Sequence, residues 1–101
     1  MNDSIESVDK ETKKKIIAII AALVPQAKIY LFGSRARNTY SQSSDIDIAI
    51  DGGKPLPRSS VYELNSIFEA SNIFERIDVV DFHQVSQDMR DSIQKEGILW
   101  K

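Results

Sequence analysis

The sequence contains no cysteine and only one histidine, His83. Without thiols the chain has no disulfide framework, no thiolate zinc site and no thiol nucleophile, and one histidine does not make a zinc site. Its stability must therefore come from packing, and any metal ion must be held by oxygen ligands. We expect His83, which directly follows a predicted strand, to have a surface or capping role.

The sequence also lacks a long apolar run and a strong excess of either charge. Its longest apolar segment, residues 16–25, is too short to cross a bilayer, and residues 1–6 are polar and acidic. Thirteen basic and fifteen acidic residues give a net charge of -2, which provides no general attraction for a nucleic-acid backbone. These absences predict a cytoplasmic protein with no membrane segment and no general nucleic-acid binding.

The composition is that of one globular domain. The 101 residues are 42% apolar and 28% charged, which suits a single modest core. We expect residues 1–8 to form a polar extension and residues 9–101 to form the domain. Apolar spacing and turn residues predict, in order, a helix over 9–23, a strand over 28–32, a short helix over 34–40, a strand over 44–50, a loop over 52–57, a helix from residue 60, a strand over 76–82, a helix over 86–96 and an apolar tail over 98–100 that packs or pairs at an edge. This order predicts an α+β fold of two layers, with a small mixed sheet and helices packed against it.

Three of the predicted helix ends carry capping signals. Ser34 follows a glycine and is predicted to be the N-cap of the short helix. Ser60 and Glu63 have the spacing of a capping box, which would begin the next long helix. Gly97 is predicted to close the last helix at its C′ position.

Acids and isoleucines alternate along the predicted strand over residues 44–50. Because side chains of a strand alternate between its faces, Asp45 and Asp47 project from one face while three isoleucines project from the other. Aspartate is depleted in strands, so two aspartates among isoleucines are expected mainly at a functional site. Neighbouring carboxylates repel each other unless a cation lies between them. The pattern therefore favours a divalent metal site over a merely solvated strand face.

A Gly-Ser turn, Gly33 and Ser34, follows the apolar strand over residues 28–32. Glycine lets the backbone turn sharply and approach a ligand, and the first amides of the helix that follows point outward as hydrogen-bond donors. Together these features can hold a phosphate group, and Arg35 and Arg37 add positive charge nearby. Taken alone, the same residues are also compatible with an ordinary turn that ends a strand.

A third carboxylate comes from the apolar strand over residues 76–82. An unpaired charge in a buried strand costs several kcal/mol, roughly, so Asp78 requires a cation or hydrogen-bond donors. Asp81 lies three residues further on and faces the other way, so only one of the two can join Asp45 and Asp47. We favour Asp78, because Asp81 lies near the strand end, where a solvated or capping role is easily satisfied.

These residues resemble the signature of a known family. The run Leu31-Phe32-Gly33-Ser34-Arg35-Ala36-Arg37-Asn38, followed by Ser44-Asp45-Ile46-Asp47-Ile48-Ala49-Ile50, resembles the minimal nucleotidyltransferases of the DNA polymerase beta-like superfamily. Their pattern is a Gly-Ser turn, a short gap, an Asp-x-Asp pair and a third acid on a later strand. Asn38 departs from the pattern, which usually has glycine there, but asparagine tolerates a left-handed backbone.

The resemblance implies a metal-dependent transfer of a nucleoside monophosphate from a nucleoside triphosphate, expected to be AMP from ATP. The expected metal ligands and catalytic residues are Asp45, Asp47 and Asp78, with one or two Mg2+ ions as cofactor. Asp78 would take the acceptor side and help to deprotonate the attacking hydroxyl. The residues expected to line the nucleotide site are Gly33, Ser34, Arg35, Arg37 and Ser44.

The resemblance also implies a partner, because so short a chain leaves little material to enclose both a base and an acceptor. Proteins of this kind often act beside a separate helical protein, as in toxin-antitoxin pairs, and that partner either completes the site or is the acceptor. A homodimer is the other arrangement that the apolar tail allows. The alternative function is a non-catalytic, antitoxin-like subunit that neutralises a helical partner by contact alone.

Overall fold

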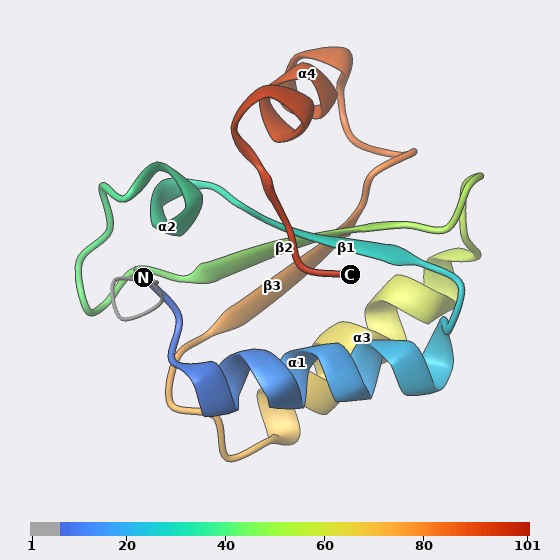
Figure 1. Cartoon of the computed structure of the whole chain (residues 1–101). Coiled ribbons are helices and arrows are strands. Elements are labelled where there is room, and N and C mark those ends of the chain that lie inside the picture. The colour runs from blue at the N-terminus through green and yellow to red at the C-terminus, as the bar shows by residue number, and fades with distance from the viewer. Residues whose placement is uncertain (1–6) are drawn as a thin grey trace.

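The computed structural model describes residues 7–101, which form four helices and one four-stranded sheet (Figure 1). The helices are α1 (Lys10–Leu23), α2 (Ser34–Arg37), α3 (Arg58–Ala70) and α4 (Gln87–Glu96). The strands are β1 (Lys28–Phe32), β2 (Ile46–Asp51), β3 (Ile77–Asp81) and β4 (Ile98–Leu99). The order of elements and their periodicities agree with the prediction, and most boundaries differ by one or two residues.

The sheet is mixed, in the order β3-β2-β1-β4. β1 is antiparallel to both β2 and β4, whereas β2 and β3 run parallel. A parallel pair requires a crossover connection, which α3 provides on one face of the sheet. The predicted α+β fold is confirmed, and the apolar tail pairs with β1 at the sheet edge as β4.

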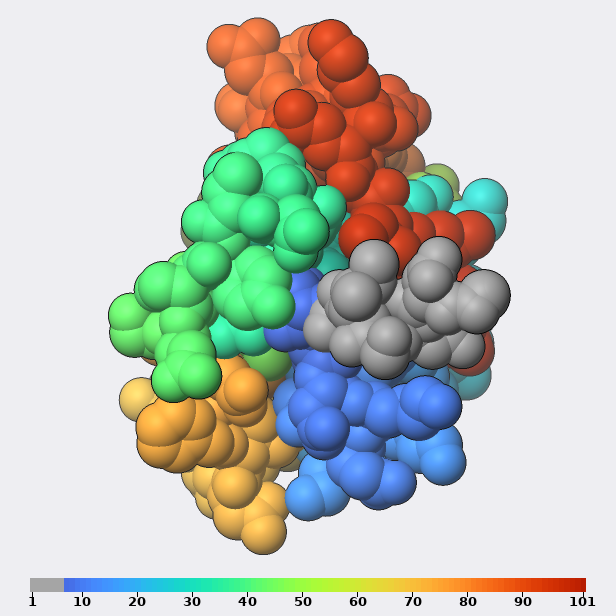
Figure 2. Space-filling view, turned by 60° about the vertical axis from the view of Figure 1, so that its left-hand side comes forward, coloured from blue at the N-terminus to red at the C-terminus, as the bar shows by residue number. Residues whose placement is uncertain are grey.

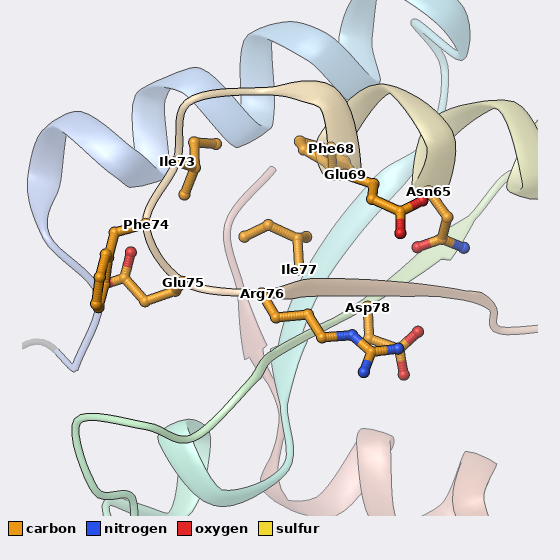
Figure 3. A pocket seen from close by; sticks show the side chains of 9 residues that line it. All are labelled: Asn65, Phe68, Glu69, Ile73, Phe74, Glu75, Arg76, Ile77 and Asp78. Carbon is orange, nitrogen blue, oxygen red and sulfur yellow. The ribbon is translucent and has the colours of Figure 1, made fainter.

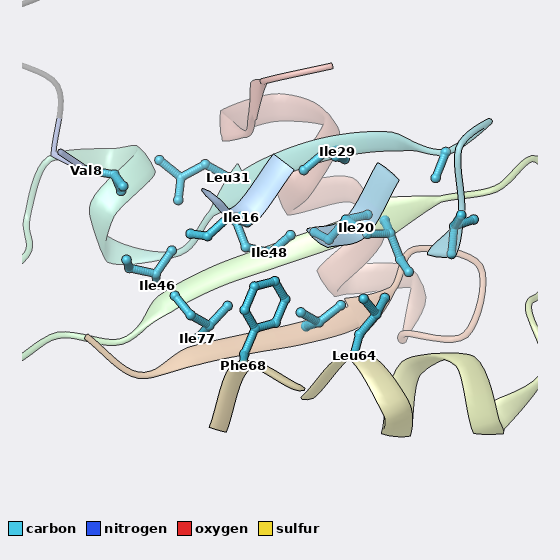
Figure 4. Close-up of a cluster of buried hydrophobic side chains, with 14 residues drawn as sticks. Val8, Ile16, Ile20, Ile29, Leu31, Ile46, Ile48, Leu64, Phe68 and Ile77 are labelled. Carbon is cyan, nitrogen blue, oxygen red and sulfur yellow. The ribbon is translucent and has the colours of Figure 1, made fainter. Parts of the chain in front are cut away.

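The main core lies between the sheet and the layer formed by α1 and α3 (Figure 4). The three isoleucines of β2, Ile46, Ile48 and Ile50, are fully buried in it, as their alternation with aspartates predicts. Ile16 and Ile20 of α1 pack against them from the helix layer. Because the isoleucines of β2 are buried on one face of the sheet, the aspartates that alternate with them must lie on the opposite face, away from the core.

The other face of the sheet is only partly covered. α4 lies over it, and Ile93 of α4 packs with Ala49 and Phe82 in a small second cluster (Figure 1). Tyr30 and Phe32 border this cluster. The first residues of β2 and β3 lie beyond it, so their side chains on this face stay accessible.

The helix ends correct two of the three capping predictions. The N-cap of α2 is Gly33, so Ser34 is the first helical residue. Helix α3 begins two residues earlier than predicted, after Pro57, and no side chain caps it, so Ser60 and Glu63 form no capping box. Proline at that position fixes a backbone angle that suits a helix start, which explains the earlier beginning.

Gly97 ends α4 as predicted, but in an extended conformation with φ -71°. Glycine is therefore not required at residue 97 for a left-handed backbone conformation. A Cβ atom at residue 97 would overlap with the carbonyl oxygen of Ile93. Close approach of the backbone requires the glycine, and it directs the chain from α4 back to β1.

The N-terminal boundary of the domain also needs correction. Val8, which the sequence analysis assigned to the polar extension, is only 2% exposed and belongs to the main core. The Oγ atom of Ser7 donates a hydrogen bond to the carbonyl of Arg35 at 2.8 Å. The rest of the predicted extension, residues 1–6, lies outside the described residues. Within residues 7–101, no helix combines the length and apolar character needed to span a membrane.

Candidate active site

Two of the predicted carboxylates stand side by side at one end of the sheet. Asp47 of β2 is in register with Asp78 of β3 and, on its other side, with Phe32 at the end of β1. Residues in register project from the same face of a sheet, so both carboxylates lie on the face opposite the main core. Asp45 precedes Asp47 by two residues and therefore points to the same side. The structure thus brings the three predicted acids to one face and one end of the sheet.

The loop before Asp45 and the segment before Asp78 lie against each other. The backbone N–H of Ile46 donates to the carbonyl of Arg76 at 2.8 Å, which extends the ladder between β2 and β3 by one bond. Figure 2 shows the green segment around residues 38–45 directly above the gold segment around residues 72–78. This contact keeps Asp45 beside the start of β3.

The environment at this end of the sheet disfavours the ionised form of Asp47. Burial, followed by the negative charges of Asp78 and Asp45, raises the pKa of Asp47 above its ordinary value, and Arg37 only partly opposes this. The three acids therefore influence one another and lack enough positive charge in the protein itself. An added cation would relieve this repulsion, as a divalent metal does in sites made of carboxylates.

The three carboxylates are the type of ligand that an oxygen-bound metal requires, and they lie at the same end of the sheet. They are not yet close enough together to coordinate one ion. No group of three acidic, histidine or cysteine side chains in residues 7–101 is close enough to hold an ion without movement. Asp45 is the exposed member of the three, so its side chain has room to turn toward Asp47.

Gly33 places the turn after β1 directly against Asp47. Its backbone has φ 77° and ψ -157°, a region that residues with a side chain rarely occupy. A Cβ atom at residue 33 would overlap with Oδ2 of Asp47 and lie 3.1 Å from its Cγ atom. Glycine is therefore required both for the turn and for the position of the Asp47 carboxylate. Ser34 begins α2 next to it and is half-buried.

Asn38, which departs from the family pattern, ends α2 in the left-handed conformation with φ 63° and ψ 31°. The prediction that asparagine tolerates this backbone is confirmed. The N–H of Asn38 donates to the carbonyl of Ser34, so the departure leaves the end of α2 properly formed.

Arg35 and Arg37 have different environments. Arg35 is only 5% exposed, and its guanidinium donates to the carbonyls of Ser7 at 2.7 Å and of Ser44 at 3.0 Å. Its cation also lies over the ring of Tyr40, 5.0 Å from the centroid. These contacts occupy the donors of Arg35, which argues against the expected contact with phosphate. Arg37 is exposed and lies 3.6 Å from Glu96 of α4, so it is the arginine available to an anion beside Asp47.

Replacing Arg35 by alanine should destabilise the protein by about 2–4 kcal/mol, since the part-buried carbonyl groups of Ser7 and Ser44 would lose a charged donor and the buried side chain would lose its packing. Chemical unfolding at equilibrium measures this difference. Arg37→Ala is the matched control on the same helix turn, because Arg37 is exposed and should change the free energy of unfolding by less than about 1 kcal/mol. Equal losses in the two variants would contradict the assignment of Arg35 to a buried structural role.

Ser44 lies in the loop between α2 and β2, and both of its oxygen atoms accept hydrogen bonds. Its Oγ atom accepts the N–H of Ser41 at 2.9 Å, and its carbonyl accepts Arg35. Ser44 thus fixes the shape of the loop that leads into Asp45. Its predicted contact with a nucleotide stays a prediction.

Asp81, the other candidate for the third acid, has a capping role. It is in register with Ile50 and lies on the core side of the sheet, where it is 3% exposed. Its carboxylate accepts the backbone N–H groups of Leu56 at 2.8 Å and of His83 at 2.9 Å. The position of Asp81 therefore leaves Asp78 as the acid of β3 that stands beside Asp47.

One side-chain pair, at the opposite end of the sheet, was not predicted from the sequence. Nε2 of His83 lies 2.6 Å from Oδ1 of Asp51. β2 ends at Asp51 and the parallel strand β3 ends two residues before His83. Carboxyl ends of adjacent parallel strands meet at the same edge, so this pairing was readable once β2 and β3 were taken as parallel.

The pair predicts a particular dependence of stability on pH. Burial alone would raise the pKa of Asp51, but the Gly53 N–H and His83 more than offset it and hold that pKa below its ordinary value. A carboxyl with a lowered pKa contributes stability above about pH 4, and this contribution is lost as the pH falls further. Asp51→Asn should therefore lose less stability than the parent protein between about pH 5 and pH 3. Urea unfolding across this range tests it, and parallel curves for the two proteins would refute it.

The chain is similar to proteins of one family. The sequence model described as "Polymerase beta, Nucleotidyltransferase" matches residues 14–100. A Haemophilus influenzae protein described as "Probable protein adenylyltransferase MntA" is 34% identical over 77 residues, which cover 76% of this chain and 68% of that protein. The region matched by the family model, residues 14–100, includes the Gly-Ser turn and all three acids at the end of the sheet.

Solved structures share the fold of this chain. A structure described as a toxin-antitoxin with AMP-PNP matches with a TM-score of 0.74 and 31% identity, over 86% of this chain and 70% of that chain. A complex described as a tri-AMPylated Shewanella oneidensis HEPN toxin with an MNT antitoxin matches with a TM-score of 0.67 and 28% identity, over 86% of this chain and 66% of that chain.

Proposed function

This chain belongs to the polymerase beta nucleotidyltransferase family and is a nucleotidyltransferase, and on that premise we propose that it transfers AMP from ATP to a partner protein. The relative from Haemophilus influenzae is described as a protein adenylyltransferase, and the two solved structures contain an ATP analogue and an AMPylated toxin. These descriptions support ATP as the nucleotide and a separate, toxin-like protein as the acceptor. That the partner is helical stays a prediction. The expected homodimer and the cytoplasmic location stay predictions.

The observation that carries the proposal is the register of Asp47 with Asp78 beside the turn at Gly33. In the proposed site, Asp45 and Asp47 would hold Mg2+, and Asp78 would serve the acceptor side. When bound, the metal supplies positive charge for the acids and the phosphates at once. Without it, burial and then the negative charges of Asp78 and Asp45 raise the pKa of Asp47.

The nucleotide would lie over the accessible face of the sheet, with its phosphates at the start of α2. The Gly33-Ser34 turn approaches the phosphates through its backbone, since no side chain at residue 33 separates it from Asp47. Arg37, the last residue of α2, adds a cation beside Asp47. We assign Arg35 and Ser44 an indirect role, because their bonds fix the loop that positions Asp45.

The reaction is an in-line displacement at the α-phosphorus. The acceptor hydroxyl oxygen forms a bond to this phosphorus, the bond to the oxygen that bridges to the β-phosphorus breaks, and pyrophosphate leaves. Asp78 accepts the proton of the hydroxyl as the new bond forms. Most of the rate enhancement in such a site comes from positioning and from neutralising charge, because the protein makes no covalent bond to the nucleotide.

The alternative of a non-catalytic antitoxin-like subunit is not favoured. The relatives that share its fold include a protein adenylyltransferase and a complex with an AMPylated toxin. A subunit that acted by contact alone would also have no reason to place three acids in mutual repulsion, since burial and like charges disfavour the ionised form of Asp47.

Intact-mass spectrometry of the proteins that co-purify with this chain tests the proposal. After incubation with ATP and Mg2+, a partner protein should gain the mass of one or more AMP groups, and omission of Mg2+ should prevent the gain. Incubation with GTP or CTP in place of ATP tests the choice of nucleotide. A partner of unchanged mass, with the added ATP also unchanged, would refute the proposed transfer.

A further inference from the structure

A groove runs along the outer edge of β3, immediately beside Asp78. It encloses about 490 Å3 between α3, the segment 71–76 and the edge of the sheet. Asn65 and Glu69 line it from α3, and Asp78 stands at one end (Figure 3). The apolar floor is formed by Phe68 and Ile77. Nothing in the nucleotide site requires this groove, because the Gly33 turn lies on the other side of β2.

The edge of β3 inside the groove has one backbone position that bonds neither to β2 nor to α3. The N–H of Ile46 donates to Arg76 and the N–H of Phe82 donates to Ile50, so even-numbered residues of β3 bond toward β2. The backbone groups of Ile77 and Val79 therefore point away from the sheet. The Asn65 side chain already satisfies Val79, with bonds of 2.9 Å to its N–H and 3.0 Å to its carbonyl. Ile77 is left as the edge position at which another backbone can bond.

The mouth of the groove is apolar at one point and acidic elsewhere. Phe74 lines the groove and is 93% exposed, so its ring is accessible to a ligand. Glu69, Glu75 and Asp78 also line the groove, and Arg76 is the only basic residue that does. Figure 3 shows Arg76 beside Asp78 on one side of β3 and Glu69 on the side of α3. An anionic ligand such as a nucleotide or a nucleic acid would be repelled here.

We propose that this groove binds the acceptor segment of the partner protein in an extended conformation, with the acceptor hydroxyl at Asp78. The acidic lining selects a segment that carries lysine or arginine close to that hydroxyl, and Phe74 contacts an apolar residue of the same segment. The segment bonds to the free edge at Ile77, as strands added to a sheet edge do. This inference rests on the proposed function in one respect, because it takes Asp78 to be the carboxylate that serves the acceptor.

Binding of two peptide pools tests the groove. Both pools contain fluorescent peptides with a central serine, threonine or tyrosine, flanked in one pool by lysine and arginine and in the other by aspartate and glutamate. At low ionic strength the full chain with Mg2+ should bind the basic pool about tenfold more tightly, as measured by fluorescence anisotropy. Glu69→Lys/Glu75→Lys should weaken that binding by about fivefold to tenfold, and Glu69→Gln/Glu75→Gln should fall between.

The control pair is Glu63→Lys/Asp91→Lys, which changes the net charge equally at exposed residues that do not line the groove. It should leave the affinity for the basic pool unchanged. Equal weakening by this pair, or no binding of the basic pool, would overturn the inference. Transfer of labelled AMP from ATP separates the two claims. Binding that depends on Glu69 and Glu75 without transfer contradicts the proposed function, whereas transfer that ignores these residues contradicts the groove.

Discussion

Asp47→Asn should lower the rate of AMP transfer by about a thousandfold, because the amide cannot provide the negative charge that holds Mg2+ against the phosphates. Asp47 is the central acid of the site, between Phe32 and Asp78 in the sheet and in contact with the Gly33 turn. Transfer of label from ATP to the partner protein measures the effect. The matched control is Asp51→Asn, which removes a carboxylate from the other end of the same strand and should leave transfer unchanged.

The loss of activity in Asp47→Asn should not come from unfolding. Burial and the charges of Asp78 and Asp45 raise the pKa of Asp47, so the folded protein holds that proton more tightly than the unfolded chain does. The contribution of this group to stability is therefore complete below about pH 4 and is lost as the pH rises through the raised pKa. At neutral pH the variant should unfold at the same temperature as the parent or at a higher one. A lower unfolding temperature together with normal transfer would contradict both parts of this expectation.

Gly33→Ala should reduce AMP transfer by about a hundredfold, since a misplacement near 1 Å at a reacting group can have an effect of this size. The new methyl group overlaps with the Asp47 carboxylate and must displace it. The variant should also lose about 1–3 kcal/mol of stability, because its backbone stays in a region that favours glycine. Steady-state transfer rates and chemical unfolding measure the two effects separately.

Gly53→Ala separates backbone strain from displacement of Asp47. Gly53 has φ 87°, which also favours glycine, but a Cβ atom there would meet nothing within 4 Å. This variant should lose a similar amount of stability and keep its transfer activity. If Gly33→Ala and Gly53→Ala had equal activity, contact between residue 33 and Asp47 would not matter for the reaction.

The sequence was enough to predict the sheet and the clustering of acids because both follow from periodicity. Alternation along β2 separates the buried isoleucines from the aspartates, and the structure keeps that separation without exception. The same alternation predicts that only one of Asp78 and Asp81 can join the other acids, and Asp78 is favoured because Asp81 lies near the strand end. The register between β2 and β3 then places Asp78 directly beside Asp47 in the sheet.

Roles that depend on tertiary contacts were not readable in the same way. Arg35 and Arg37 are two residues apart on α2, yet one is buried against carbonyl groups and the other faces solvent beside Asp47. No local pattern distinguishes them, because the carbonyl partner at Ser7 is distant in sequence. The Cβ contact that requires glycine at residue 33 is likewise formed with a residue of another strand.

The measurement that tests the central claim most directly is the position of a bound metal. Mn2+ can replace Mg2+ in carboxylate sites, and it broadens the NMR signals of nearby amides. With a non-hydrolysable ATP analogue present, broadening should centre on Gly33, Asp47 and Asp78, and it should disappear in Asp47→Asn. Broadening centred instead on Asp51 and Asp81, the acids at the other end of the same strands, would contradict the account.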